Sequence, residues 1–294
     1  MGKYEYADPA DVEKASDIEA AVRKTVFNYL HGQLGWSLEQ CERRVEKELN
    51  RDIPQATFDM LERRWGWNLP GTRLLDIGAG QGGAVLEALD RGAGAYGVEP
   101  GEEFAVLSRR RLDDAGHDPE RIHRTGGEAL PFPDDHFDYA VSLQVLEHVE
   151  DPRPLLEEMY RVLKPGGKAL VECENYLAFR EQHYRVPWFP LLPKFLGSVY
   201  LRAIGRHPSF LNNYVFYTTY PQIWRLASSV GFRNTTYQRR LTKARTLEGI
   251  HESSSAVAAR VLNVFPEAVR VTLARWATHA QHLFGVGIRL HLVK

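Results

Sequence analysis

A glycine-rich stretch after an apolar run is the clearest chemical signal in the chain. Gly78, Gly80 and Gly83 form a G-x-G-x-x-G pattern that would let the backbone approach a ligand closely, although a tight strand-to-helix turn alone could also explain it. Two acids add to the ligand interpretation. Glu99 ends the next apolar run, where a carboxylate can accept both hydroxyl protons of a ribose. Asp76 stands two residues before the first glycine.

The Asp76 carboxylate discriminates between two ligands for such a loop. A dinucleotide would place a pyrophosphate over the glycines and the helix N-terminus, where backbone amides favour an anion. A carboxylate at that position would repel the pyrophosphate. S-adenosylmethionine has no phosphate and brings a cationic amine and a sulfonium, which a carboxylate attracts. The residues therefore favour S-adenosylmethionine as the cofactor.

Residues 74–173 resemble a class I S-adenosylmethionine-dependent methyltransferase. They are most similar to the branch with a type 11 methyltransferase domain, which includes ubiquinone and menaquinone methyltransferases. The resemblance is carried by five motifs in the family's order: Asp76-x-Gly78-x-Gly80; Glu99; Gly127-Glu128-Ala129-Leu130-Pro131-Phe132 with Asp135-His136-Phe137-Asp138; Leu146-Glu147-His148-Val149; and Leu163-Lys164-Pro165-Gly166-Gly167.

The resemblance implies where the cofactor would bind. The expected cofactor-binding residues are Asp76, Gly78, Ala79 and Gly80 at the methionine end, Glu99 and Pro100 at the ribose, Glu128, Ala129 and Leu130 around the adenine, and Gln144 beneath the sulfonium. Glu128 stands where this branch more often has Asp, and it could instead be a solvated loop acid. Gln144 could equally make a structural hydrogen bond.

Four residues are candidates for catalysis. In-line methyl transfer mainly needs alignment of the two reactants, whereas a sugar hydroxyl also needs a general base or a metal. Glu147 and His148 follow the predicted fourth strand, at the edge where open α/β sheets bind ligands. His183 and Tyr184 begin an aromatic-rich stretch where this family places acceptor recognition. The alternatives are that His148 caps a loop and that the second pair packs on the sheet.

The resemblance also implies a metal site. In ubiquinone-type O-methyltransferases, acids and a histidine around a Leu-Glu-His motif can hold a divalent metal. Glu147 and His148 match this set, and Glu174 after the fifth strand is the third candidate ligand, for Mg²⁺. Gln144, however, occupies a position where another acid would be expected, and it is a poorer ligand for a hard cation.

The elements that must position these residues alternate between strands and helices. We predict an α/β fold with a doubly wound, seven-stranded Rossmann-like sheet. The expected strands are 73–77, 95–98, 121–124, 137–143, 169–173, 232–240 and 287–293, the helices between them are 81–91, 102–115, 152–163 and 219–230, and 164–167 is a tight turn.

Four regions are expected along the chain. Residues 1–68 form an N-terminal helical cap with helices at 10–31 and 37–50, and 69–175 form the S-adenosylmethionine-binding core. Residues 176–217, rich in aromatics and prolines, are an acceptor-binding insertion or lid. Residues 218–294 complete the sheet and include a helical insertion at 253–282.

The side chains of the insertion are compatible with several classes of methyl acceptor. Trp188, Phe189 and Tyr200 could stack on a sugar or aromatic ring, and 191–206, with its lysine and arginines, could lie on a lipid surface as a lipid-linked acceptor would require. These aromatics could also simply form a lid core. We favour O-methylation of a small molecule or glycan. The alternatives are C- or N-methylation of a quinone or secondary metabolite, and a non-catalytic binder of the cofactor.

The composition of the chain argues against several classes of binding partner. With a net charge of -1 and a pI near 6.8, the chain has no global basic field for nucleic acid, so DNA is not expected and RNA is disfavoured. Two cysteines cannot build a disulfide framework. No apolar run approaches the roughly 18 residues of a membrane span, and the charged N-terminus does not resemble a signal peptide. A cytoplasmic protein is expected.

Overall fold

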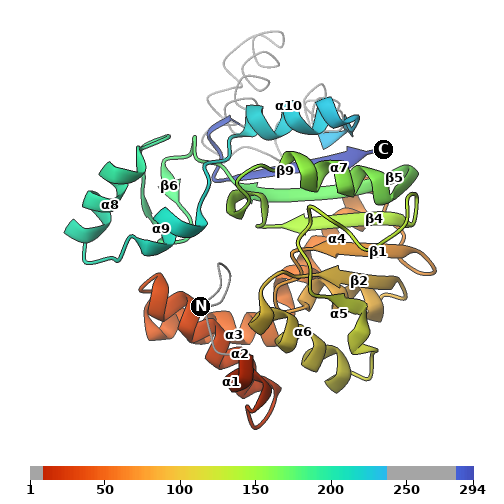
Figure 1. The fold of residues 1–294 in the computed structure, drawn as a ribbon, viewed down its shortest axis with the longest axis horizontal. Coiled ribbons are helices and arrows are strands. Elements are labelled where there is room, and N and C mark those ends of the chain that lie inside the picture. Colours follow the sequence, from red (N-terminus) through yellow and green to blue (C-terminus); the bar gives the residue numbers. More distant parts are fainter. Residues whose placement is uncertain (1–8, 237–282) are drawn as a thin grey trace, which may run out of the picture.

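The computed structural model describes residues 9–236 and 283–294, and in them a seven-stranded sheet has the order β3-β2-β1-β4-β5-β9-β8 (Figure 1). The strands are β1 (Arg73–Ile77), β2 (Gly94–Val98), β3 (Ile122–His123), β4 (Phe137–Leu143), β5 (Leu163–Glu174), β8 (Arg233–Asn234) and β9 (Gly287–Val293). Neighbouring strands from β3 to β5 are parallel, and β9 runs antiparallel to both β5 and β8. The predicted α/β, Rossmann-like fold is confirmed.

Each face of the sheet is covered by helices. On one face, α4 (Asp52–Trp65), α5 (Gly83–Asp90) and α6 (Glu102–Asp114) pack against β1 and β2, and on the other, α7 (Arg153–Val162) and α10 (Tyr220–Val230) pack against β4, β5 and β9. Because both faces are covered, the central strands are mostly apolar. Leu74, Leu75 and Ile77 of β1 are completely buried. The strand order reverses between β1 and β4, and such switch points form ligand-binding crevices at the carboxyl edge.

The N-terminal helices are shorter than their apolar spacing predicts. A single helix was expected at 10–31, but the chain forms α1 (Pro9–Glu13), α2 (Ile18–Val26) and a π-helical segment (Phe27–Gln33). The cause is Asp17, whose side chain accepts a hydrogen bond from the Ala20 N–H and starts α2 afresh. The expected helix at 37–50 is α3 (Leu38–Leu49), which Ser37 and Gln40 cap reciprocally.

The insertion forms a lobe with these N-terminal helices. It contains a short hairpin of β6 (Arg180–Glu181) and β7 (Val186–Pro187), followed by α8 (Lys194–Ala203) and α9 (Ser209–Tyr214). Tyr184, Trp188 and Phe210 from the insertion share one apolar cluster with Val22 and Leu34 from the N-terminal helices. Figure 1 shows both groups of helices at the carboxyl ends of the parallel strands.

Other element boundaries differ locally from the sequence prediction. The segment 164–167, expected as a separate turn, lies inside β5, where Gly166 has φ +79° and the pairing with β4 shifts register. The predicted strand 232–240 is described only as β8, and 237–240 lie outside the described residues, as does the helical prediction for 253–282. Within the described ranges, no helix is both long and apolar enough to cross a bilayer.

Candidate active site

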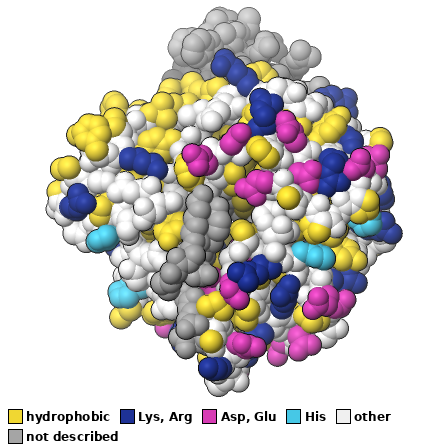
Figure 2. All heavy atoms as spheres, in the orientation of Figure 1, with side chains coloured by type: hydrophobic (Ala, Val, Ile, Leu, Met, Phe, Trp, Pro, Cys, Tyr) yellow, Lys and Arg dark blue, Asp and Glu magenta, His cyan; other side chains and the backbone are white. Residues whose placement is uncertain are grey.

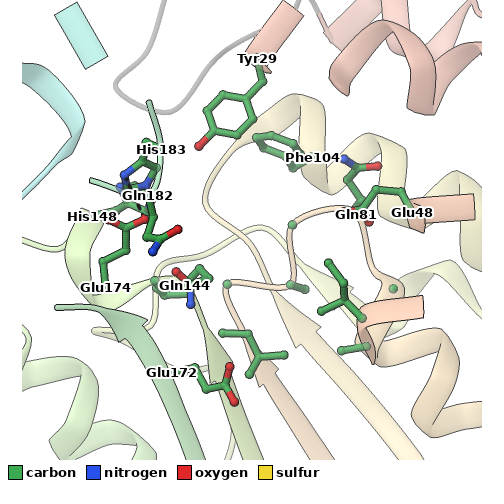
Figure 3. Close-up of a pocket in the computed structure, with 18 of the residues that line it drawn as sticks. Tyr29, Glu48, Gln81, Phe104, Gln144, His148, Glu172, Glu174, Gln182 and His183 are labelled. Carbon is green, nitrogen blue, oxygen red and sulfur yellow. Dashed lines mark ion pairs between the residues drawn. The ribbon is translucent and has the colours of Figure 1, made fainter. Parts of the chain in front are cut away.

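A cavity of about 1270 Å³ lies at the carboxyl edge of the sheet (Figure 3). Its floor comes from the loops that follow β1, β2 and β4 and from the end of β5. Its walls come from the N-terminal helices, through Tyr29 and Glu48, and from the β6–β7 turn, through Gln182 and His183. The lobe and the sheet therefore enclose one site together.

The glycine loop after β1 has the backbone shape that its sequence predicts. The N–H groups of Gly78 and Ala79 both donate to the Val98 carbonyl at 2.9 Å, which fastens the loop to the end of β2. Gly78 has φ +78°, and a Cβ there would lie 2.3 Å from Cγ2 of Val145. Gly80 has φ +52° and would place a Cβ in open space, so the backbone is exposed to a ligand at this point.

Two buried acids lie beside this loop. The carboxylate of Glu99 accepts hydrogen bonds from the N–H groups of Gly80 and Gly101, both at 2.8 Å. Burial raises the pKa of Glu99, and these two amides oppose that effect. Burial, and secondly the charge of Glu99, raise the pKa of Asp76 to about 7. A cation bound here would relieve the repulsion between the two carboxylates.

The segment expected at the adenine lies only partly in the cavity. Gly126, Gly127 and the exposed Glu128 line it. Ala129 and Leu130, expected to flank the adenine, are not among the lining residues. Leu130 belongs to the core beneath α7, and its N–H donates to Glu158 at 2.8 Å. Sequence reasoning missed Phe104, which lines the cavity from the first turn of α6.

Gln144 and Pro100 both line the cavity. Gln144 follows β4 with φ +60°, its N–H donates to the Glu172 carbonyl at 2.7 Å, and its side chain is exposed to the cavity (Figure 3). Glu172 lies beside it and forms an ion pair with Arg289 of β9.

The predicted catalytic residues lead to a buried cluster of charged groups. His183 Nδ1 lies 3.0 Å from Oε1 of Glu181 and 3.3 Å from Oε1 of Glu174. The rings of His148 and His183 are 5.2 Å apart, and Phe210 of α9 packs against both. Glu181, which the sequence analysis did not select, lies two residues before His183, on the hairpin that brings both into the site.

The charge state of this cluster follows from its burial. Burial alone would lower the pKa of His183, but the carboxylates of Glu174 and Glu181 outweigh it and raise that pKa well above the usual value. Burial, then the charge of Glu174, raise the pKa of Glu147 to about 8. Burial, then the His183 cation, lower the pKa of His148 to about 3. At neutral pH these shifts favour a cationic His183, a neutral His148 and a protonated Glu147.

His148 is held in one tautomer. Its Nδ1 lies 2.7 Å from the backbone carbonyl oxygen of Tyr214 on α9. Because a carbonyl can only accept, the proton must be on Nδ1, and Nε2 keeps its lone pair. The ring lines the cavity, so Nε2 is a candidate basic group of the site.

Glu147 and Tyr184 do not line the cavity. Tyr184 is a correction to the catalytic set: it lies in the core of the lobe, where its hydroxyl donates to the His207 carbonyl at 2.8 Å and accepts from the Leu211 N–H. Glu147 is fully buried behind His148. Backbone N–H groups of Glu147 itself and of Glu174 lie near its carboxyl, but no hydrogen-bond partner of good geometry reaches it among the described residues.

The cluster also contains donor atoms suited to a metal. Two triads have ligand atoms within 4.8 Å of one another: Glu147, His148 and His183, and Glu174, Glu181 and His183. The predicted ligands Glu147, His148 and Glu174 are thus divided between two triads that His183 joins. The unpartnered carboxyl of Glu147 fits a ligand role. A site with two imidazoles suits Mn²⁺, Fe²⁺ or Zn²⁺ better than the Mg²⁺ expected from the sequence.

Comparison with known proteins agrees with this geometry. Residues 75–171 match the model of the methyltransferase domain family. Together with the glycine loop and its two acids, this match defines a domain of the S-adenosylmethionine-dependent methyltransferase class, whose cofactor is S-adenosylmethionine.

Individual relatives match parts of the chain. The ubiquinone biosynthesis O-methyltransferase of Pseudomonas entomophila is 33% identical over 46% of this chain and 57% of its own length. The phosphoethanolamine N-methyltransferase 2 of Caenorhabditis elegans is 31% identical over 37% of this chain and 25% of its own length. The chain thus spans little more than half of one relative and a quarter of the other.

A solved structure shares the fold. The phosphoethanolamine N-methyltransferase 2 of Haemonchus contortus, in complex with S-adenosyl-L-methionine, covers all of this chain and 60% of that chain, with 19% identity and a TM-score of 0.50. The predicted resemblance to S-adenosylmethionine-dependent methyltransferases is confirmed.

Proposed function

We propose that this chain is an enzyme that transfers the methyl group of S-adenosylmethionine to a hydroxyl oxygen of a small molecule or glycan, with His148 as the general base. The observation that carries the proposal is the contact of His148 Nδ1 with the Tyr214 carbonyl, which leaves the lone pair of this cavity-lining imidazole on Nε2. Asp76 and Gly80 hold the methionine end of the cofactor and Glu99 its ribose.

The proposed step is a single displacement. The acceptor oxygen attacks the methyl carbon as the carbon–sulfur bond breaks, which releases S-adenosylhomocysteine, and the hydroxyl proton passes to Nε2 of His148. A pKa of about 3 makes this imidazole a weak base, but it is wholly unprotonated at neutral pH. The hydroxyl becomes strongly acidic as its oxygen is alkylated, so a weak base suffices late in the reaction.

The charged cluster can be balanced in two ways, without or with a bound metal. Without a metal, the His183 cation balances the carboxylates of Glu174 and Glu181. With one, Glu147, His148 and Glu174, joined by His183, would hold the ion, which would acidify the acceptor hydroxyl. The ion would then occupy Nε2 of His148 and replace its role as the base. Elemental analysis of the purified protein separates these cases, because a stoichiometric metal would require His183 to be neutral.

N-methylation is the second candidate. The resemblance to a phosphoethanolamine N-methyltransferase and the acids Glu172 and Glu174 at the cavity wall would suit an amine acceptor. We favour oxygen because an ammonium must lose a proton before it can attack, and an imidazole with a pKa of about 3 is too weak to take that proton. C-methylation of a quinone has no residue in the cavity that argues for it specifically.

The test combines an acceptor panel with two histidine variants. Phenols, glycans and amines are incubated with labelled S-adenosylmethionine, and mass spectrometry locates the methyl group. We expect an O-methyl product, with His148→Ala lowering kcat by about 10²-fold or more and leaving the Kd of the cofactor unchanged. The control, His117→Ala, removes a ring that pairs with Asp90 away from the cavity and should change neither. N- or C-methyl product, or unchanged kcat in His148→Ala, would overturn the proposal.

A further inference from the structure

The outer surface of the lobe is apolar where a surface helix would normally be polar. Along α8, Gly197, Ser198 and Leu201 face the interior, whereas Phe195, Leu196 and Val199 point outward and are 68%, 44% and 61% exposed. The outward face of this helix is thus apolar, whereas the outward face of a water-exposed helix is normally polar. Something other than water is expected to cover this face.

The neighbouring hairpin extends the same surface. Phe179, Phe189 and Leu191 are 62%, 67% and 47% exposed. They are held together by backbone hydrogen bonds, because the N–H of Trp188 donates to the Phe179 carbonyl and that of Leu192 to the Phe189 carbonyl. We call these side chains, together with the exposed apolar side chains of α8, the apolar patch. Figure 2 shows hydrophobic side chains gathered over the α8 and β6 lobe, with Lys and Arg side chains bordering them.

The Lys, Arg, Asp and Glu residues of the insertion and the segment after it are nearly all basic. Between Glu181 and Glu248 the sequence has no Asp or Glu, but it has ten Lys and Arg residues. Of these, Arg202 is exposed on α8 itself, and just before this stretch Arg180 lies exposed on β6. Arg185 is also exposed, but its guanidinium lies over the Trp36 ring at the cavity. A basic, apolar surface is complementary to an anionic one that also accepts hydrocarbon side chains.

We propose that the apolar patch docks this protein onto a membrane that contains anionic lipids. The Phe, Leu and Val side chains would enter the boundary between headgroups and acyl chains, and the arginines would contact lipid phosphates. A second copy of this chain would bring two basic surfaces together, which repulsion disfavours. RNA would match the charge, but it would leave Leu196 and Val199 in contact with water.

The patch adjoins the cavity, which gives docking a consequence for the substrate. The ring of Phe179 lies 6.2 Å from that of Phe284, and Val286, two residues further on, is 47% exposed and lines the cavity. Arg185 lines it as well. If the proposed methyl transfer holds, the docked enzyme would take an amphiphilic acceptor whose polar head enters the cavity while its apolar tail stays in the bilayer.

The direct test is co-sedimentation of the full chain with vesicles. We expect it to bind vesicles of phosphatidylcholine with phosphatidylglycerol, to bind phosphatidylcholine alone more weakly, and to dissociate as salt rises. Phe195→Ser combined with Val199→Ser should weaken binding about tenfold or more. A matched pair, Leu38→Ser with Trp224→Ser, removes exposed apolar side chains from α3 and α10 and should leave binding unchanged.

Two further measurements show whether a loss of vesicle binding comes from the patch itself or from a damaged fold. Titration with S-adenosylmethionine should be the same in all these variants, because the fold and the cofactor site stay intact. Arg202→Glu, which changes only an exposed charge, should weaken binding to the anionic vesicles alone. The proposal is overturned if the wild type does not bind anionic vesicles, or if both pairs of substitutions change vesicle binding equally. It is also overturned if the patch instead mediates dimerisation or RNA binding.

Discussion

The carboxylate of Glu99 and the backbone N–H of Gly80 are joined by a hydrogen bond of 2.8 Å across the mouth of the glycine loop. This contact ties the end of β2 to the loop that follows β1, and its partner bond to Gly101 fixes the same carboxylate against α6. One acid thus sets the loop's shape and faces the position expected for the ribose.

Glu99→Gln should weaken cofactor binding. The amide group can accept only one of the two backbone hydrogen bonds, and its NH₂ would face a buried N–H. We expect the Kd for S-adenosylmethionine to rise about 10-fold or more, measured by calorimetry. Glu157→Gln, which alters an exposed ion pair on α7, is the matched control. Equal affinity in Glu99→Gln and wild type would remove Glu99 from the site.

Cofactor affinity should depend on pH through Asp76. The pKa of this carboxyl is about 7 in the protein without ligand, and only its ionised form attracts the cationic cofactor. Affinity should therefore be full above pH 7 and fall as pH drops through 7, to about one-tenth at pH 6. Calorimetric titration from pH 5.5 to 8.5 measures this dependence. Asp76→Asn should bind weakly at every pH, and a pH dependence that persists in this variant would assign it to another group.

The parts of the fold that sequence could predict are those with strong local patterns. The strand at Gly287–Val293 was predicted from its alternating apolar residues, and the glycine loop from its spacing. The break between α1 and α2 was missed because apolar spacing runs through Asp17, whose capping bond overrides it.

The buried charged cluster around His183 depends on contacts that no local pattern encodes. Glu181 and His183 meet Glu174 only because the β6–β7 hairpin folds back over the end of β5. Tyr184 adjoins His183 in the turn between β6 and β7, but its side chain packs into the core of the lobe, where its hydroxyl donates to the His207 carbonyl. The tautomer of His148 likewise depends on Tyr214, 66 residues away.

The glycine loop should tolerate no side chain at Gly78. Gly78 and Gly116 have nearly the same φ, +78° and +77°, but a Cβ at Gly116 would meet nothing within 4 Å. Both Gly→Ala changes carry the cost of a left-handed backbone, about 1 kcal/mol. Gly78→Ala also collides with Val145, which should add about 2 kcal/mol in urea unfolding and abolish cofactor binding.

A second substitution checks that the collision is the cause. Val145→Ala removes both methyl carbons that the new Cβ would meet. Gly78→Ala loses more stability than Gly116→Ala, and the double variant Gly78→Ala with Val145→Ala should recover most of that extra loss. Additive losses in the double variant would contradict the steric cause.

His183 should stabilise the fold in a pH-dependent way. Its folded pKa lies well above the unfolded value of about 6.5, so its contribution is fully present below pH 6.5 and is lost as pH rises through the folded pKa. His183→Gln leaves the buried carboxylates of Glu174 and Glu181 without a cation and should cost about 3 kcal/mol at pH 6. Urea unfolding of both proteins from pH 6 to 10 measures the difference, which should shrink as pH rises. The control is His207→Gln, at an exposed histidine, whose free energy of unfolding should differ from that of the wild type by no pH-dependent amount. If the difference in free energy of unfolding between His183→Gln and wild type stays constant with pH, His183 is neutral in the folded protein.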